Sequence, residues 1–304
     1  MRGIVFMLAA VCIFSIMDAL MKLLSAHYAP LQIACLRSVS SLVCLMGMIL
    51  WQGSWRTLGL TKPWLHVFRA CLGIIMLASF VFAVHRITLA QAYSVFLAAP
   101  LLMTALSVPL HGERVAGRRW LAILLGLSGV FVALQPWAKG AISLVAASAA
   151  AIATVCYCLS ALTLRSLGAR DSSLSMVFWY LALVGLGSAA LSFHDWQAIL
   201  PGDWKWLAAI GVSGGLGQLW LTEAFRRAPP SVVGPFEYTS IFWAFVIDWI
   251  FWSAAPSTNL MIGAAIAIAS GIFIIWDEHR LGDVAPIEGD PAIMGAKAGA
   301  IVPP

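Results

Sequence analysis

AFRRAPPSVVGPFEYTSIFW, residues 224–243, decides the fold because the chain carries a weaker copy of it, AVHRITLAQAYSVFLAAPLL, at residues 83–102. The two segments align at an offset of 141 residues (224 minus 83). Further along, GVFVAL at 129–134 aligns with GIFIIW at 271–276, with one residue added between the two matches. We therefore expect the second half of the chain to repeat the fold of the first half.

The composition places the chain in a membrane. Of 304 residues, 62% are hydrophobic and 10% are charged, and the mean hydropathy is +0.93. A water-soluble domain needs more polar surface than this composition supplies. The chain is therefore expected to be a polytopic membrane protein.

Apolar runs of about 20 residues, long enough to cross a bilayer as helices, recur along the chain. They lack sustained alternation of polar and apolar residues, which favours helices over barrel strands. We expect an all-α integral membrane protein with ten transmembrane helices, at 4–24, 30–51, 64–85, 88–110, 118–137, 141–163, 173–193, 204–225, 231–252 and 258–276.

The repeat pairs the fourth expected helix with the ninth and the fifth with the tenth. Each unit then has five helices, an odd number, so the second unit is expected to be inverted in the membrane. Residues 1–137 form the first unit, 138–278 the second, and 279–304 a disordered cytoplasmic tail. Inverted repeats are typical of alternating-access carriers, with the substrate site between the halves near the midplane.

The basic residues predict the orientation of this chain. With the N-terminus inside, three of the 18 Lys and Arg residues (Arg86, Lys139 and Lys205) face outward, and three (Lys22, Arg37 and Arg69) fall within spans. Because cytoplasmic loops are enriched in basic residues, we expect both termini in the cytoplasm of a bacterial inner-membrane protein. The remaining 12 face inward: Arg2, Arg56, Lys62, Arg114, Arg118, Arg119, Arg165, Arg170, Arg226, Arg227, Arg280 and Lys297.

Three segments carry a family resemblance. FSIMDALMKLLSAHYAPLQIACLRS (14–38), APLLMTALSVPLHGERVAGRRWLAILLGLSGV (99–130) and AFRRAPPSVVGPFEYTSIFWA (224–244) resemble the EamA repeats of the drug/metabolite transporter superfamily, over roughly residues 4–278. The signatures look most like a branch that includes uptake carriers for S-adenosylmethionine and riboflavin. This resemblance implies a ten-helix secondary transporter. Trp243, in the middle of the ninth span, would then face the central cavity.

The sequence departs from the family pattern in the second half. The family often repeats a Gly-Glu pair at the end of the fourth helix of each half. Gly112-Glu113 supplies the first pair, whereas Ser253-Ala254 stands where the second would fall. Asp248 occupies a position where the branch commonly has a small residue.

Two carboxylates lie on the ninth span. Asp248 falls among Trp249 and Trp252, so solvation at the outer rim is the simpler account of it. Glu237 lies about two turns inside the inner boundary, at the same end as Glu223 and Arg226. An ionisable group in a span is a functional candidate, although an ion pair with an arginine would make its role structural.

A second charged group is expected in the outer half. Asp18 and Lys22 lie one helical turn apart in the order that favours an ion pair, and Arg37 falls at a comparable depth on the next span. These three side chains either gate the outside or neutralise one another. We expect the structural role for Lys22 and Arg37, and both roles stay open for Asp18.

Aromatic and amide residues complete the expected binding site. Such side chains favour a ligand with a planar ring, for example a flavin, an adenine or an indole, although each alone is more often packing. The substrate-binding candidates are Trp243, Tyr238, Glu237, Tyr93, Phe96, Gln218 and Trp220.

The predicted function is secondary transport of a small organic metabolite, most simply uptake of a vitamin or nucleoside-like compound such as riboflavin or S-adenosylmethionine. An exporter of amino acids or other metabolites is the alternative. GVSGGLG at 211–217 is not followed by Lys-Ser or Lys-Thr, which favours close helix packing over phosphate binding. An intramembrane enzyme is disfavoured because no HExxH motif occurs. No cofactor, metal or nucleic acid is expected; the partners are the substrate and the lipid bilayer, and a homodimer stays open.

Overall fold

The computed structural model describes residues 2–52, 58–111, 117–135, 143–167, 171–227 and 233–282. The Gly112-Glu113 pair and residues 283–304 of the expected tail lie outside these ranges. Within them every regular element is helical. The longer elements are α1 (Arg2–Leu24), α2 (Pro30–Gln52), α3 (Pro63–Val84), α4 (Leu89–Phe96), α5 (Ala99–His111), α6 (Gly117–Leu134), α7 (Leu144–Leu167), α8 (Ser173–Ser192), α9 (Trp204–Arg227), the 3-10 helix η3 (Gly234–Tyr238), α11 (Thr239–Trp252) and α12 (Thr258–Gly282).

The described helices suit a bilayer in length and polarity. Six segments are long and apolar enough to cross it, and 120–134 and 258–274 are shorter apolar helices. Large apolar side chains cover the outside of the bundle: Val43 is 68% exposed, Leu124 62% and Phe251 67%. Exposed apolar surface on this scale requires lipid rather than water around it. The expectation of an all-α membrane protein is confirmed.

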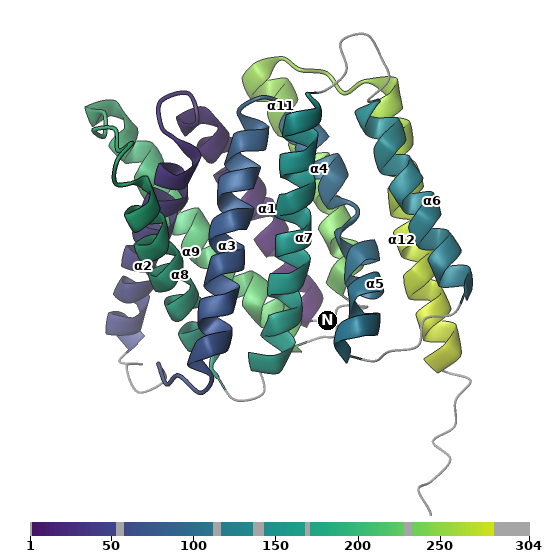
Figure 1. The fold of residues 1–304 in the computed structure, drawn as a ribbon, viewed down its shortest axis with the longest axis horizontal. Helices are drawn as coiled ribbons and strands as arrows, with labels where there is room; N and C mark the ends of the chain where they lie inside the picture. The colour runs from purple at the N-terminus through teal and green to yellow at the C-terminus, as the bar shows by residue number, and fades with distance from the viewer. Residues whose placement is uncertain are drawn as a thin grey trace, which may run out of the picture.

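The helices stand side by side in one bundle, and α1 begins at the same end at which α12 finishes (Figure 1). Helices α6 and α12 form a pair at one side of the bundle, and α2, α8 and α9 lie at the other side. Helices α1, α3, α4, α7 and α11 fill the middle. The principal packing partners are α1 with α9, α3 with α7, α2 with α8, and α6 with α12.

Glycines bring several of these helix pairs into close contact. A side chain at Gly211 of α9 would lie 2.8 Å from the carbonyl oxygen of Ser40 in α2. In the outer pair, a side chain at Gly129 of α6 would lie 2.7 Å from the carbonyl oxygen of Gly263 in α12. Small residues permit such approach between membrane helices. The expected packing role of the glycine-rich stretch in α9 is confirmed.

Two of the expected spans are not continuous α-helices. The span at 88–110 breaks after Phe96, and the chain restarts as α5 at Ala99, with Pro100 in its first turn. In the described part of the span at 231–252, the 3-10 helix η3, which contains Pro235, precedes α11, which begins at Thr239. Proline lacks an N–H and disfavours the helical conformation of the residue before it, so it is accommodated most readily in the first turn of a helix. At the offset of 141 residues, the two interruptions occupy equivalent places.

Candidate substrate cavity

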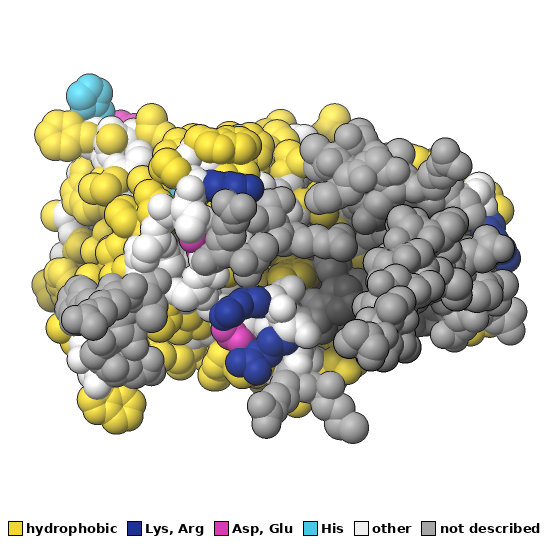
Figure 2. Space-filling model, turned by 90° about the horizontal axis from the view of Figure 1, so that it is seen from below, with side chains coloured by type: hydrophobic (Ala, Val, Ile, Leu, Met, Phe, Trp, Pro, Cys, Tyr) yellow, Lys and Arg dark blue, Asp and Glu magenta, His cyan; other side chains and the backbone are white. Residues whose placement is uncertain are grey.

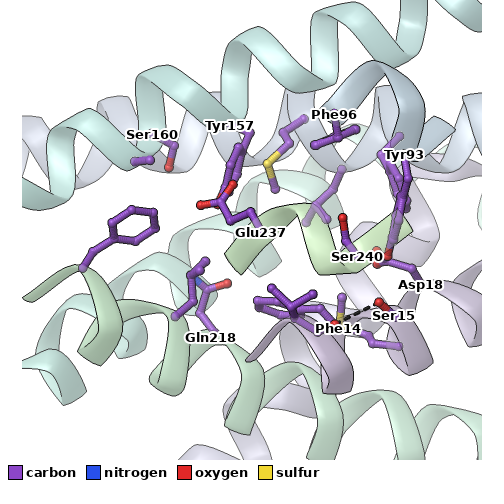
Figure 3. A pocket seen from close by; sticks show the side chains of 18 of the residues that line it. Phe14, Ser15, Asp18, Tyr93, Phe96, Tyr157, Ser160, Gln218, Glu237 and Ser240 are labelled. Atoms are coloured by element: carbon purple, nitrogen blue, oxygen red, sulfur yellow. Dashed lines mark hydrogen bonds between the residues drawn. The ribbon is translucent and has the colours of Figure 1, made fainter. Parts of the chain in front are cut away.

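A cavity lies among the central helices, where both interrupted spans meet α1, α7 and α9. It extends from Met21, near the C-terminal end of α1, to Leu164 and Phe225, near the C-terminal ends of α7 and α9, which lie at the other end of the bundle. Figure 3 shows the side chains that line it. The polar and charged ones are Ser15, Asp18, Arg37, Arg69, Tyr93, Tyr157, Ser160, Tyr180, Gln218, Glu237, Tyr238 and Ser240.

Glu237 enters the cavity from η3. The 3-10 turn directs its carboxylate across to α7, where the hydroxyl of Tyr157 donates a hydrogen bond to it over 3.1 Å (Figure 3). No Lys or Arg of the described residues forms a salt bridge with Glu237. The proposed ion pair with an arginine is therefore not present in this structure, and Glu237 remains a carboxylate held by a phenol.

The neighbouring charges near that end pair with one another instead. Glu223 of α9 forms salt bridges with Arg226, at 3.4 Å, and with Arg227, and it accepts a hydrogen bond from Ser173. This cluster does not contribute to the cavity lining. Seen from below, basic side chains gather beside acidic ones near the middle of that face (Figure 2).

Asp18 enters the cavity from α1, where its carboxylate accepts a hydrogen bond from the hydroxyl of Tyr93 on α4 (Figure 3). Among the described residues, Asp18 has no salt bridge with Lys22. The expected ion pair between these two neighbours on α1 is wrong. The two side chains point from α1 toward different helices, and each contacts a residue that is distant in the chain.

Lys22 instead pairs with Asp248, whose side chain is 1% exposed. The Asp248 carboxylate also accepts the backbone N–H groups of Leu89 and Ala90, at 3.2 and 2.7 Å. These N–H groups belong to the first turn of α4 and have no partner within that helix. The prediction that Asp248 is solvated at the rim is wrong, because the acid is buried and neutralised. This cluster lies just beyond Met21, at the end of the cavity nearest the C-terminus of α1.

Two arginines also line the cavity. Arg37 and Arg69 are each 2% exposed, and neither forms a salt bridge with a carboxylate among the described residues. From the sequence we expected Arg37 to belong to a neutralising network, and we assigned no role to Arg69. The signal for Arg69 was available, because a cation inside an apolar span is itself a functional indication.

Aromatic rings form the remaining wall. The ring of Phe96 lies 5.6 Å from that of Phe80 and 6.1 Å from that of Tyr157, measured between centroids. Tyr238 and Gln218 also line the cavity, as expected. Trp220 and Trp243 do not. They belong to an apolar cluster on α1 and α9 that adjoins the cavity, because Val11, Tyr157 and Phe225 belong to both.

A helical membrane bundle with a cavity of mixed polar and aromatic lining inside it is the arrangement of a membrane transporter. The EamA-like transporter family model matches residues 1–135 and 144–276, so the chain belongs to this family.

Several curated relatives cover nearly the whole chain. The pseudopaline exporter of Pseudomonas aeruginosa is 28% identical over 276 residues, which are 90% of this chain and 93% of the relative. A riboflavin transporter of Vibrio cholerae is 26% identical over 92% of this chain and 95% of its own length. An S-adenosylmethionine uptake transporter of Rickettsia prowazekii is 22% identical, with coverage of 92% and 94%.

The fold also has a solved counterpart. A crystal structure that is 20% identical in sequence superposes with a TM-score of 0.69, and the match covers 92% of this chain and 98% of that one. At this identity the likeness shows the fold. The chain is thus a membrane transporter of the EamA kind, and its substrate and direction of transport are questions for the cavity itself.

Proposed function

We propose that the protein is a secondary transporter that moves a small metabolite with a planar ring across the bacterial inner membrane by alternating access. The observation that carries this proposal is the central cavity, which combines the aromatic side chains Phe96 and Tyr157 with the carboxylates Asp18 and Glu237. Aromatic faces stack on planar rings, and a few polar groups fix the orientation of a ligand.

An inverted five-helix repeat accounts for the pattern of helix packing. In this scheme α4 and α5 together cross the membrane once, and so do η3 and α11. The chain then crosses the membrane ten times, five times in each of the units 1–137 and 138–278. The contact of α1 with α9 then corresponds to that of α7 with α3, and the contact of α2 with α9 to that of α8 with α3. The pairs α2 with α8 and α6 with α12 each correspond to themselves. Such correspondence is expected from a two-fold axis between the halves.

The charge bias of the loops supports an orientation with both termini in the cytoplasm. The Lys22–Asp248 cluster then closes the cavity toward the outside. Leu164 and Phe225 stand at its cytoplasmic limit.

Uptake of riboflavin, S-adenosylmethionine or a related compound is the first candidate. A riboflavin transporter and an S-adenosylmethionine uptake transporter are similar to the chain over nearly its full length, which supports this candidate. Export is the second candidate function. It is favoured by the pseudopaline exporter, at 28% identity.

The test is transport by the purified protein. Proteoliposomes loaded with unlabelled compound should accumulate the same labelled compound by counterflow, with riboflavin and S-adenosylmethionine as the first two probes. Inverted and right-side-out vesicles distinguish uptake from export. Failure of every ring compound in a panel of vitamins, nucleosides and amino acids, with correctly folded protein, would contradict the proposal.

A further inference from the structure

Four charged side chains line the cavity without a salt bridge among the described residues. Asp18 and Glu237 each accept a hydrogen bond from a tyrosine, and Arg37 and Arg69 contact no carboxylate. Two positive and two negative groups leave the cavity neutral overall. Isolated buried charges are costly, so a cavity that keeps them apart is suited to a ligand with both signs of charge.

Arg37 is the least satisfied of these groups. Its Nε donates to the thioether of Met17 over 3.2 Å, which is a weak acceptor, and its Nη1 has no partner although the residue is 2% exposed. Arg69 also has one donor without a partner, its Nε, but its Nη1 donates to the carbonyl of Met176 over 3.2 Å and its guanidinium lies 4.6 Å from the ring centre of Tyr180. A guanidinium with a free donor presents the geometry that a carboxylate accepts.

Asp18 stands at the same depth as Arg37. Asp18 lies six residues before the end of α1 and Arg37 seven after the start of α2, so both are about 10 Å below that end of the bundle. The two side chains attract one another electrostatically, yet no salt bridge closes the gap between them. Both border the cavity, as do Ser15 and Tyr93 beside Asp18 (Figure 3).

We propose that Asp18 and Arg37 form the subsite for an aminocarboxylate group, with the ligand's carboxylate on Arg37 and its ammonium on Asp18. The planar ring of the same ligand then extends toward Phe96 and Tyr157. This inference rests on the proposed function and narrows its substrate class to zwitterionic ring compounds. Riboflavin carries neither charge, whereas S-adenosylmethionine carries both and a ring.

The test compares two ligands that differ only in this group. S-adenosylhomocysteine and 5′-methylthioadenosine share the adenosine and thioether parts, and only the first has an aminocarboxylate. Binding to the purified protein in nanodiscs should be at least tenfold tighter for S-adenosylhomocysteine. L-tryptophan and tryptamine, which lacks only the carboxylate, test the part assigned to Arg37 alone on an indole ring.

R37Q should reduce the difference within each pair to less than threefold while leaving 5′-methylthioadenosine and tryptamine unaffected. D18N should do the same for the adenosine pair, but it should weaken L-tryptophan and tryptamine alike, because both carry the ammonium. R37K keeps the charge but not the planar fork, and should lose most of the preference. R118Q is the control, because Arg118 pairs with Asp277 on α6 and α12, outside the cavity. Melting temperatures establish that each variant is folded. If R37Q does not fold, D18N still tests the proposal.

The inference is overturned if both members of each pair bind equally, or if R37Q weakens both members alike. It is also overturned if neither pair binds to folded protein that binds riboflavin, in which case the proposed function stands. If none of the ring compounds binds or is transported, the proposed function itself is contradicted.

Discussion

Lys22 and Asp248, which are 226 positions apart in the chain, form an ion pair with 3.3 Å between Nζ and Oδ1. The ammonium of Lys22 also lies 4.5 Å from the ring centre of Trp252. The same carboxylate caps the N-terminus of α4 through Leu89 and Ala90. One acid thus joins α1, α4 and α11 at the end of the cavity.

Removing that acid is expected to be more damaging than removing its partner. D248A should lower the free energy of unfolding by about 3–5 kcal/mol, because it leaves a buried ammonium and two unpaired N–H groups. K22A should cost less, since the carboxylate keeps both backbone donors. The melting temperatures of the purified variants show which substitution destabilises the protein more. Equal effects would show that the contacts with α4 contribute nothing.

Ser253 ends α11 with a φ of 52°, in the left-handed region. This is the position at which the family often has the glycine of its second Gly-Glu pair. Because a side chain is unfavourable in this conformation, S253G should raise stability by about 1 kcal/mol. S148G, at an exposed helical site in α7, is the control and should lower stability by a similar amount. A loss of stability in S253G would contradict the assignment.

Gly271 of α12 faces the hydroxyl of Tyr238 so closely that an added Cβ would overlap it. G271A should therefore displace Tyr238 from the cavity wall and reduce transport severalfold at normal protein amounts. G47A is the matched control, because nothing lies within 4 Å of a Cβ at Gly47 on α2. The control should keep full transport. Wild-type kinetics in G271A would remove Tyr238 from the site.

Among the described residues, Glu237 has a phenol and no cation as its partner, which suits a carboxylate that gains and loses a proton during transport. E237Q mimics the protonated form at nearly equal volume. We expect it to abolish net uptake against a gradient, while exchange survives and loses its pH dependence. Y157F, which removes only the hydrogen bond, should keep net uptake with an altered pH profile.

Both modes are measured in the same proteoliposomes between about pH 5.5 and pH 8, a range that brackets neutrality. Equal loss of net uptake and exchange in E237Q, together with a lower melting temperature, would make Glu237 a structural partner. Full retention of pH-dependent uptake would exclude it from the mechanism.

The fold class was readable from the sequence because spanning helices depend on local hydrophobicity. The positions of most helix ends followed from Gly, Pro and charged residues, and α8 at 173–192 matches its expected span of 173–193. The break after Phe96 was missed, although Pro100 signals that the helix restarts nearby.

The charge partners were not readable, because they depend on tertiary packing. Spacing on one helix favoured an ion pair of Asp18 with Lys22. In the structure Asp18 instead accepts a hydrogen bond from Tyr93, and Lys22 pairs with Asp248. Depth alone placed Asp248 at the rim, whereas the packing of α4 buries it. Trp243 was assigned to the cavity by its midspan position, but depth does not determine which face of a helix a residue occupies.

The central claim is that the cavity between the helices is the transport pathway. Ser240 of α11 lines the cavity, and its substitution removes no charged side chain (Figure 3). In a variant whose six native cysteines are replaced, S240C should transport normally, and a small permeant maleimide should then abolish transport. A transported compound should protect S240C against labelling, whereas V43C, which faces lipid, should keep full transport after the same treatment. Transport that persists after complete labelling of S240C would contradict the account.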